Sequence, residues 1–489
     1  MPDPQIAPEE STSPKTAPFW KVILLSALAG GMGWGIRGQY GHETGAMVPG
    51  LLIGLVVAVF LGRGLTSLQA ASAAGLAALG ISFGGVETMA QTVGLTHNPG
   101  VIGNWSALTW GMIGLFIKGG LWVGFAGALM GMGFSSKRYR FQEIAILFLV
   151  MMGLTFLGIY LLNEPFQPKS HILPFLYFSA SWHWYPHVAN PEPRREIWGG
   201  LLFAFLGLLV FLSKIAQDRL ARNAALIGAL SGGIGWCLAQ SVQAYHNWNV
   251  IKFQHGWFAP FEVHMNWWNN METTFGFFIG GGLGLAMWLN RKYIAPKEEN
   301  GEEELPPNQE IILLVLYSAA LVSWNFVDFD LFGRFADYVF TMAIIPGIAL
   351  LCGRSFPYWF VYPLVALTIA GETLTQCCYT THFIPAMTGW ILLFIAPMLL
   401  TIFAARNSIL KSSQGETGQP FALRALLLTT WLYFTLNFVF FEFPVWPWMP
   451  TTHRTFNNFI FFMCSVVITA VVVMARNNGE INSNKTLQT

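Results

Sequence analysis

A pattern of three polar residues occurs three times in this chain, each time at the end of a hydrophobic segment. An acidic residue (Trp in one copy) is followed by Gln four positions later and by His six positions after the Gln. The three copies are Glu87-Gln91-His97, Glu372-Gln376-His382 and Trp236-Gln240-His246. Because residues four apart lie on one face of a helix, the pattern predicts a carboxylate and an amide on the same helix face. The His is expected in the loop just beyond.

These residue types could bind a polar solute and move protons at one composite site. Carboxylates accept hydrogen bonds, amides both donate and accept them, and imidazole titrates near neutral pH. We expect Glu87 and Gln91 to face Glu372 and Gln376 across a shared pocket on the extracytoplasmic side. The alternative is a duplication in which only structural caps have been kept.

A second repeated pattern pairs an Arg with a polar residue three positions later. Its copies are Arg334-Asp337 and Arg454-Asn457, with looser matches at Arg37-His42-Glu43 and Arg194-Arg195-Glu196. The planar guanidinium fork suits a carboxylate or a phosphate. Aromatic, Asn and His residues on the same side suit sugar rings, although aromatic residues are also typical of the interfacial belt of membrane proteins.

Together these residues define the predicted substrate-binding set. It consists of Arg37, His42, Glu43, Glu87, Gln91, His97, Gln240, His246, Glu272, Arg334, Asp337, Glu372, Gln376, His382 and Arg454. If the protein is an enzyme, its acid and base groups would come from a smaller set. That set is Glu87, Glu372, Glu43, Glu272, His97 and His382.

Lys118 lies near the centre of a hydrophobic segment. On insertion scales a Lys at that depth costs about 2.5–3.5 kcal/mol unless it is paired or hydrated. We therefore interpret Lys118 as a counter-ion for Glu87 or as part of an ion or proton path. The alternative is a Lys that reaches the membrane interface with its long side chain.

The composition places the chain in a lipid bilayer. Of its 489 residues, 54% are hydrophobic and only 10% are charged, whereas soluble domains carry about 25% charged residues. Apolar runs long enough to cross ~30 Å of hydrocarbon predict an all-α polytopic membrane protein with about fourteen transmembrane helices in tandem hairpins. The expected spans begin near Trp20, Ala46, Ala70, Leu108, Ile144, Trp198, Asn223, Met271, Glu310, Val339, Tyr358, Phe383, Arg424 and Phe456.

Basic residues predict the orientation of these spans. They fall in alternate loops, and the positive-inside tendency puts those loops and both termini on the cytoplasmic side of the inner (cytoplasmic) membrane. The basic loops contain Arg63, Lys137, Arg138, Arg140, Lys214, Arg219, Arg222, Arg291, Lys292, Lys297, Arg354, Arg406, Lys411 and Arg424, and Arg476 follows the last span. The net charge of +1 and the absence of a basic stripe indicate no nucleic-acid partner.

Five regions follow from these patterns. They are a disordered cytoplasmic tail (1–18), a membrane domain with spans 1–8 (19–295), an acidic cytoplasmic linker (296–309), a membrane domain with spans 9–14 (310–476) and a second cytoplasmic tail (477–489). The first polar pattern falls on the third, seventh and eleventh expected spans. This even period predicts parallel repeats of four helices about an axis along the membrane normal.

Small residues and cysteines have mainly structural interpretations. Glycine-rich stretches at 29–35, 111–133 and 276–284 predict close helix packing. Residues 35–43 could instead interrupt a helix and line a cavity. The five cysteines are interpreted as small buried hydrophobes. No cofactor motif and no metal-binding spacing is present, although a metal held by several loops stays open.

Two functions fit these observations best. The first is a transporter for a small polar solute, most plausibly a sugar or sugar acid. The second is a membrane-embedded enzyme with an extracytoplasmic active site that acts on a glycan or lipid-linked substrate. A structural or complex-forming subunit is a third option. The sequence does not identify the substrate, the coupling ion or the oligomeric state.

Overall fold

The computed structural model describes residues 18–85, 87, 89–186, 193–297, 305–326, 338–444 and 454–481, and the regular structure in these ranges is helical. The helices are α1 (Phe19–Arg37), α2 (Met47–Leu61), α3 (Ser67–Gly84), α4 (Ala90–His97), α5 (Trp105–Phe134), α6 (Phe141–Leu162), α7 (Trp198–Val210), α8 (Arg219–Trp248), α9 (Val250–His255), α10 (Ala259–Glu262), α11 (Trp267–Leu289), α12 (Pro307–Phe326), α14 (Tyr338–Cys352), α15 (Phe356–Trp359), α16 (Val365–Leu374), α17 (Ala386–Gly389), α18 (Ala396–Ser413), α19 (Gly418–Phe440) and α20 (Thr455–Asn477).

Short π-helical turns continue or join several of these helices. They span Phe211–Ile215 after α7, Phe360–Leu364 between α15 and α16, Thr375–Thr380 after α16, and Trp390–Ile395 between α17 and α18. With these turns included, a helical segment lies at each of the fourteen positions where the sequence predicts a span.

The helices have the length and composition of a multi-pass membrane protein. Within the described ranges, nine helices are long and apolar enough to cross a membrane, and three shorter apolar helices accompany them. The outer helices expose apolar side chains that water would not favour. On α6, Ile146, Phe156 and Tyr160 are among those exposed, as are Leu399 and Phe403 on α18. A surface of this kind suits lipid. Whether all fourteen segments cross the bilayer stays a prediction.

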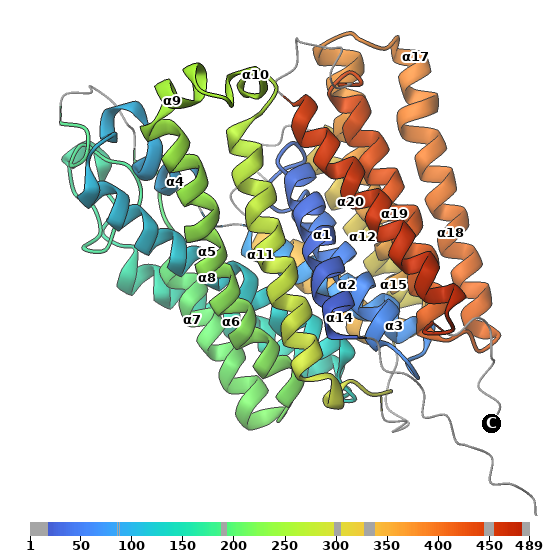
Figure 1. The fold of residues 1–489 in the computed structure, drawn as a ribbon. Helices are drawn as coiled ribbons and strands as arrows, with labels where there is room; N and C mark the ends of the chain where they lie inside the picture. The colour runs from blue at the N-terminus through green and yellow to red at the C-terminus, as the bar shows by residue number, and fades with distance from the viewer. Residues whose placement is uncertain are drawn as a thin grey trace, which may run out of the picture.

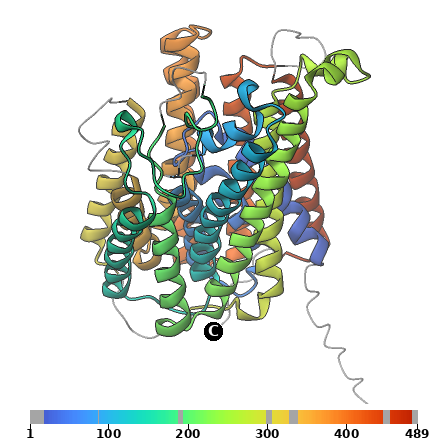
Figure 2. The same cartoon turned by 90° about the vertical axis from the view of Figure 1, so that its left-hand side faces the viewer.

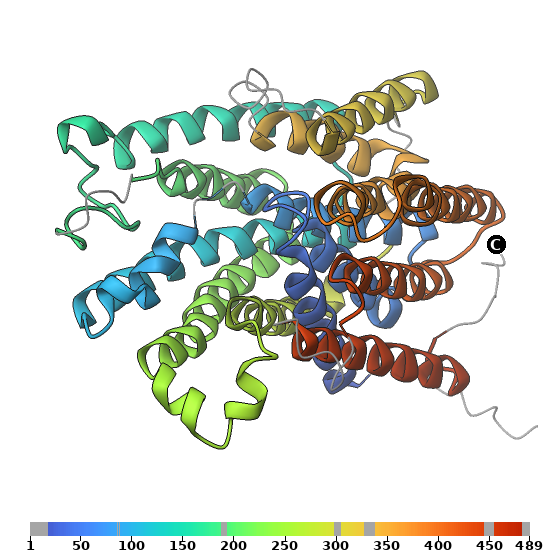
Figure 3. The same cartoon turned by 90° about the horizontal axis from the view of Figure 1, so that it is seen from above.

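Helices α1 and α2 lie in the middle of the bundle (Figures 1 and 3). On one side they adjoin the group that contains α4 to α8 and α11, and on the other the group that contains α12 to α20. α2 and α3 are almost entirely buried, whereas α6 and α18 lie at the periphery. The loop that joins α1 to α2 is therefore surrounded by helices from both groups.

The basic loops meet at one end of the bundle, here called the basic end. Backbone bridges join Thr66 to Thr417 and Ser135 to Ile294 at this end. Lys21 at the start of α1 lies 2.7 Å from Glu480, just after α20. The His-rich and Trp-rich segments lie at the opposite end, where the short helices α9 and α10 extend beyond the ends of α8 and α11 (Figure 2). In the described part of the chain, loops with basic residues and segments rich in His and Trp thus lie at opposite ends of the bundle, whereas the number of crossings and the side of each terminus stay predictions.

Glycines let several helices approach within backbone contact, as the glycine-rich stretches predict. A Cβ atom at Gly30 would lie 2.4 Å from the Gly276 carbonyl oxygen, and one at Gly280 would lie 2.0 Å from the Ser26 carbonyl oxygen. The α5–α8 pair is similar, because a Cβ at Gly127 would lie 2.1 Å from the Ala224 carbonyl oxygen. Only glycine fits at such positions without moving the neighbouring backbone.

The contact between α1 and α11 leads to a testable prediction. Gly280→Ala is expected to destabilise the protein by about 1–3 kcal/mol, because its methyl group would overlap the α1 backbone. Gly281→Ala is the matched control: its Cβ would lie 3.6 Å from Ala27, an ordinary contact. Thermal unfolding in detergent should show a lower Tm for Gly280→Ala only. Equal Tm values for the two variants would contradict this packing.

Candidate functional site

The loop at residues 38–46 is a tight turn between helices. Some of its residues are buried and others are exposed to solvent. Gly41 has φ +88°, a conformation that glycine adopts readily. Thr44 donates a hydrogen bond to the Tyr40 carbonyl oxygen at 2.5 Å and closes the turn. Tyr40 is buried, whereas His42 is exposed. The helix is therefore interrupted here, and polar groups of the loop are within reach of solvent.

Arg37, the last residue of α1, forms a buried ion pair with Glu272 of α11. The guanidinium nitrogen lies 3.2 Å from the carboxylate, and both side chains are 4% exposed. The same carboxylate accepts hydrogen bonds from Trp268 at 3.2 Å and from Asn269 at 3.4 Å. The guanidinium also lies 4.6 Å from the Trp34 ring centre. A positive charge at a helix C-terminus and a negative charge near an N-terminus are both favourable.

Arg454, which precedes α20, approaches the same loop from another direction. With the Gln39 amide oriented to satisfy its neighbours, its oxygen accepts from both terminal guanidinium nitrogens at 2.7 and 3.1 Å, and its nitrogen donates to Ile36. The guanidinium lies 4.6 Å from the Phe441 ring centre, and the Glu272 charge acts on it. Glu272 is therefore near two arginines, and Arg454 is held by a neutral amide.

His42 and Glu43 extend this group of charges along the loop. The surrounding protein and the positive charges of Arg37 and Arg194 keep the pKa of His42 well below its usual value, although the ring is partly open to solvent. The half-buried Glu43 is close enough for its charge to act on Arg37. The site therefore combines arginines, carboxylates and a neutral imidazole.

A second buried ionic cluster surrounds Lys118, in the middle of α5. Its ammonium lies 2.7 Å from Glu196 and 3.2 Å from Glu87, and it donates to the Thr92 hydroxyl at 2.9 Å. Ser179 donates a hydrogen bond to Glu196 at 2.7 Å. The Lys118 side chain is 0% exposed and the two carboxylates are at most 1% exposed. The predicted pairing of Lys118 with Glu87 is thus present, together with a second carboxylate.

Trp122 of α5 lies beside the arginine site. It lies one turn after Lys118 on α5. Its ring centre is 5.5 Å from the Arg37 guanidinium and 6.2 Å from the His42 ring centre, with the two rings stacked. Its indole nitrogen donates to the Ile81 carbonyl oxygen at 2.5 Å, which fixes the ring. Trp122 thus forms part of the aromatic wall of the arginine site, on the same helix as Lys118.

The first and third copies of the polar pattern meet at the end opposite the basic end. Gln240 of α8 donates to the Thr96 hydroxyl at 2.7 Å and lies 3.5 Å from His97. The His97 ring lies 5.9 Å from the Trp268 ring, and Trp268 in turn contacts Glu272. These two copies thus form part of one network with the arginine site.

The local structure of the copies differs from the prediction in two ways. Glu87 does not share a helix face with Gln91, because the helix is interrupted between α3 and α4. Near this interruption the Gly85 backbone packs against the His42 backbone. A Cβ atom at Gly85 would lie 2.5 Å from the His42 carbonyl oxygen. In addition, His97 and His246 lie in the last turns of α4 and α8 and not in loops. Both helices continue further than the apolar runs suggest.

Gln91 and His246 have partners outside the two clusters. The Gln91 side-chain oxygen accepts from the Arg194 backbone at 3.0 Å, which holds the segment before α7 against α4. The His246 imidazole lies 2.7 Å from Glu262 of α10 and stacks on Trp267 with ring centres 4.1 Å apart. His246 thus anchors the α9–α10 segment.

The second copy contacts the loop from the other group of helices. Thr373 lies 3.3 Å from the Tyr40 hydroxyl, and the charge of the adjacent Glu372 acts on Tyr40. Glu372 is half-buried. Gln376 lies in a π-helical turn and His382 is exposed in the following loop, which is where the pattern predicts this His. The first and second copies therefore both border residues 38–46, and Gln376 and His382 lie further out. Arg334 and Asp337 lie outside the described residues.

The predicted substrate-binding set did not include several side chains of the site. Glu196, Thr92, Ser179, Trp122 and Gln39 form the contacts that hold the two clusters together. Glu196 had a signal as part of a loose match to the Arg pattern, and Gln39 lies in the stretch 35–43 that could line a cavity. A lysine buried in hydrocarbon requires carboxylates nearby, but nothing local in the sequence selects this one.

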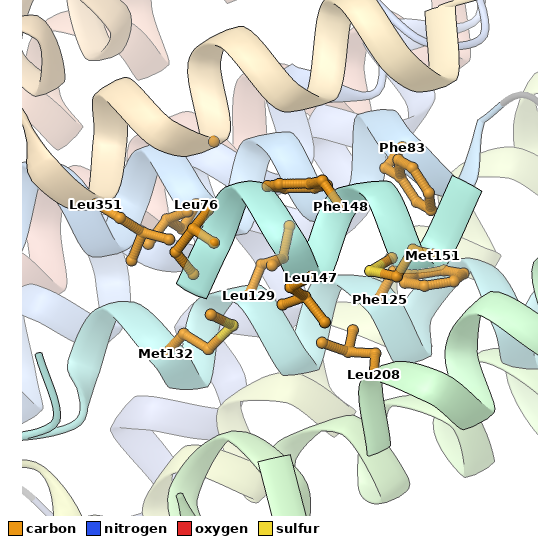
Figure 4. Close-up of a pocket in the computed structure, with 12 residues that line it drawn as sticks. Leu76, Phe83, Phe125, Leu129, Met132, Leu147, Phe148, Met151, Leu208 and Leu351 are labelled. Carbon is orange, nitrogen blue, oxygen red and sulfur yellow. The ribbon is translucent and has the colours of Figure 1, made fainter. Parts of the chain in front are cut away.

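The described residues offer no evident metal centre, and the pocket described among them is apolar. They contain no group of three His, Cys, Asp or Glu side chains placed to hold a metal ion. A pocket between α3, α5, α6, α7 and α14 is apolar (Figure 4). It is lined by Leu76, Phe83, Phe125, Leu129, Met132, Ile144, Leu147, Phe148, Met151, Leu208, Gly347 and Leu351. It offers no hydrogen-bonding side chain to a polar solute.

Fold and site together define a helical multi-pass membrane protein with two buried ionic clusters. No family model, curated protein or solved structure matches this chain.

Proposed function

We propose that this protein is an integral membrane transporter for a small polar solute, a sugar or more specifically a sugar acid. In this proposal the chain crosses the inner membrane fourteen times, as parallel repeats of four helices, with both termini in the cytoplasm. The solute binds beside residues 38–46, between Arg37, Glu272 and Arg454.

The observation that carries the proposal is the position of the two arginines. Arg37 is neutralised by Glu272, whereas Arg454 contacts the neutral Gln39 amide in the described part of the chain. A solute carboxylate could replace this amide as the acceptor for the Arg454 fork. The indole of Trp268 and the amide of Asn269 provide an apolar face and hydrogen bonds beside it, as a sugar ring requires.

The interrupted helices further support transport. Irregular backbone at membrane depth is tolerated where it is covered by protein or lines a cavity, and transporters use discontinuous helices to build solute sites. Here α1 ends at Arg37 and α3 is separated from α4 around Glu87. Both breaks lie beside buried charges.

The enzyme hypothesis has weaker support from the geometry. Two of its candidate acid or base groups, Glu87 and Glu272, are engaged in ion pairs with Lys118 and Arg37. Glycosidases instead need two carboxyl groups on either side of the scissile bond. Glu372 borders the loop through Tyr40, and His382 is exposed further out.

Uptake into liposomes tests the proposal directly. The purified protein is reconstituted, and radiolabelled D-glucuronate, D-gluconate and D-glucose are offered from outside. We expect saturable, protein-dependent entry of the two acids, with the solute recovered chemically unchanged. Binding without entry would reject transport, and recovery of a converted product would favour the enzyme. Entry of glucose alone would reject the acid preference.

The orientation gives a separate prediction. Lys252, in α9, and Lys137, in the α5–α6 loop, are both exposed and lie at opposite ends of the bundle. An impermeant thiol reagent added to intact cells should label Lys252→Cys and leave Lys137→Cys unlabelled until the cells are opened. Wild-type protein is the blank, because four of its five cysteines are buried. The reverse labelling pattern would invert the topology.

A further inference from the structure

Three buried hydrogen-bonding side chains lie on one face of α19, here called the polar face of α19. They are Thr430, Tyr433 and Asn437, and each is 0% exposed. At 3.6 residues per turn, their spacing of three and four places them within about 60° around the helix axis and over about 10 Å of its length. Within the described ranges, no group forms a hydrogen bond with the Thr430 hydroxyl, the Tyr433 hydroxyl or the Asn437 side-chain oxygen.

The adjacent Thr429 shows how a buried hydroxyl on this helix can be satisfied. It is also 0% exposed, and it donates to the Ala425 carbonyl oxygen one turn earlier at 2.8 Å. This bond within the helix is the usual one for a threonine in an apolar helix. The Thr430 hydroxyl does not make it. A buried polar group without a partner is unfavourable, and in folded proteins bound water commonly satisfies such groups. The polar face of α19 therefore offers hydrogen bonds to a molecule other than the chain itself.

The outer end of the polar face lies next to the proposed solute site. The Asn437 amide nitrogen donates to the Asn458 side-chain oxygen at 3.0 Å, and Asn458 donates to the Arg454 carbonyl oxygen at 3.0 Å. Phe440, at the end of α19, contacts Tyr40 of the loop at residues 38–46, with ring centres 5.5 Å apart. Asn437 is therefore two hydrogen bonds away from the residue that would hold a solute carboxylate.

Polar side chains continue from this face toward the basic end. Tyr433 lies close enough to Tyr362, in the π-helical turn between α15 and α16, for the two hydroxyls to interact electrostatically. Tyr362 in turn lies beside Ser408 of α18, and the charges of Arg424 and Glu416 act on it. Those two residues form a partly exposed ion pair at the basic end, at 2.7 Å. Polar groups thus follow one another from the arginine site to the opposite end of the bundle.

We propose that the polar face of α19 lines the inner part of the solute path and binds hydroxyl groups. These are the hydroxyls of water when no solute is present, and those of the sugar during its passage. The two hydroxyls of the face can donate and accept hydrogen bonds and the Asn437 oxygen can accept them, which suits a molecule with several hydroxyls. Uncharged groups hold a solute weakly enough to release it, as a path requires. The passage of the sugar rests on the transport proposal, but the binding of water does not.

The segment opposite Tyr433 has the features of an element that can move. Tyr362 lies in the π-helical turn Phe360–Leu364, which contains Pro363. Such turns are frequent at functional sites, and a proline removes one hydrogen bond of the helix backbone. The Tyr362 ring contacts Phe421 of α19, with ring centres 6.1 Å apart. Because the polar face is fully buried, the structure represents a closed path, and movement of this turn away from α19 would open it beside Tyr433.

Thiol labelling of the purified protein in detergent tests the path without any transport measurement. A small, water-soluble thiol reagent, methanethiosulfonate ethylammonium, is added to Thr430→Cys and to Thr429→Cys. The two positions are neighbours and equally buried, so Thr429→Cys is the matched control, and wild-type protein is the blank. We expect Thr430→Cys to be modified under conditions that leave Thr429→Cys unmodified, because only a thiol that water reaches can ionise and react. If Thr430→Cys reacts no faster than Thr429→Cys, the proposal is wrong.

Thermal unfolding of two conservative variants provides a second test. Thr430→Val and Tyr433→Phe each remove a hydroxyl and keep the shape of the side chain. If water binds to the polar face, both variants lose a hydrogen bond and their Tm should fall below that of wild type. On a dry face the same changes remove a buried hydroxyl that has no partner, and the Tm should rise. A Tm that rises in both variants would overturn the proposal.

Uptake experiments then separate this path from the transport proposal. Tyr433→Phe and Asn437→Leu should lower the maximal rate of D-glucuronate entry into liposomes. They should leave its binding affinity close to that of wild type, because Arg454 still holds the carboxylate. Thr429→Val, outside the polar face, should transport as wild type does. If wild type moves no solute but Thr430→Cys is labelled as expected, the transport proposal fails and the hydrated face stands. Wild-type rates in both Tyr433→Phe and Asn437→Leu would overturn the role of this face in the solute path.

Discussion

Lys118→Met is expected to destabilise the protein by about 3–5 kcal/mol at neutral pH, the cost typical of breaking a buried ion pair by removing one partner. Glu87 and Glu196, which are 3% and 1% exposed, would then lose the ammonium that lies beside both of them. Because both would take up protons in the folded state, the variant should regain stability as the pH falls. Thermal unfolding in detergent across a pH series measures the effect.

Lys21→Met is the matched control for this experiment. Lys21 also pairs with a glutamate at 2.7 Å, but the pair is partly exposed at the basic end. Surface ion pairs contribute about 0–1 kcal/mol, so the Tm of Lys21→Met should stay close to that of wild type at every pH. If Lys118→Met were equally neutral, Lys118 could not be the charge partner of Glu87 and Glu196. Transport should also be lost in Lys118→Met, even at the pH where its stability recovers.

The positions of the helices could be predicted because each depends on local sequence. Runs of about twenty apolar residues match the hydrocarbon thickness, and helical segments lie at the positions of these runs. The ends of the helices were less predictable. α5 and α8 each contain 30 residues, and in α8 polar residues continue the helix beyond the apolar part.

The partners within the site could be predicted only in part. Lys118 and Glu87 were paired from the cost of a charge in hydrocarbon, which is a local argument. Glu196 is 78 positions from Lys118, and Arg37 is 235 positions from Glu272. Which residues become partners depends on which helices pack together, and this cannot be predicted from any single segment of the sequence.

The polar pattern shows the same limit. Identical spacing suggested that the copies with Glu87 and Glu372 would face each other. Instead, the first copy contacts the third through Thr96 and Gln240, because α4 and α5 pack against α8. The copy with Glu372 borders residues 38–46 from the other group of helices. Spacing identified the repeated polar residues, whereas tertiary packing decided which of them meet; their functional role stays a prediction.

Arg454→Gln is expected to weaken binding of D-glucuronate by about 1.5–3 kcal/mol, a factor of roughly 10 to 150, because hydrogen bonds to charged groups have this magnitude. The fold should be preserved, since Gln can still pair with the Gln39 amide that Arg454 contacts. Isothermal titration with D-glucuronate and D-glucose measures the change. Only the acid should lose affinity, because the neutral sugar has no carboxylate for the guanidinium fork.

Two further variants make the Arg454 prediction specific. Arg454→Lys keeps the charge but loses the planar fork, so its affinity for D-glucuronate should lie between those of wild type and Arg454→Gln. Arg476→Gln removes an exposed arginine from the other end of the same helix, α20, and should bind as wild type does. A loss of affinity shared equally by acid and neutral sugar would mean that Arg454 shapes the loop and does not contact the carboxylate. Unchanged affinity for both solutes would place the solute elsewhere in the protein.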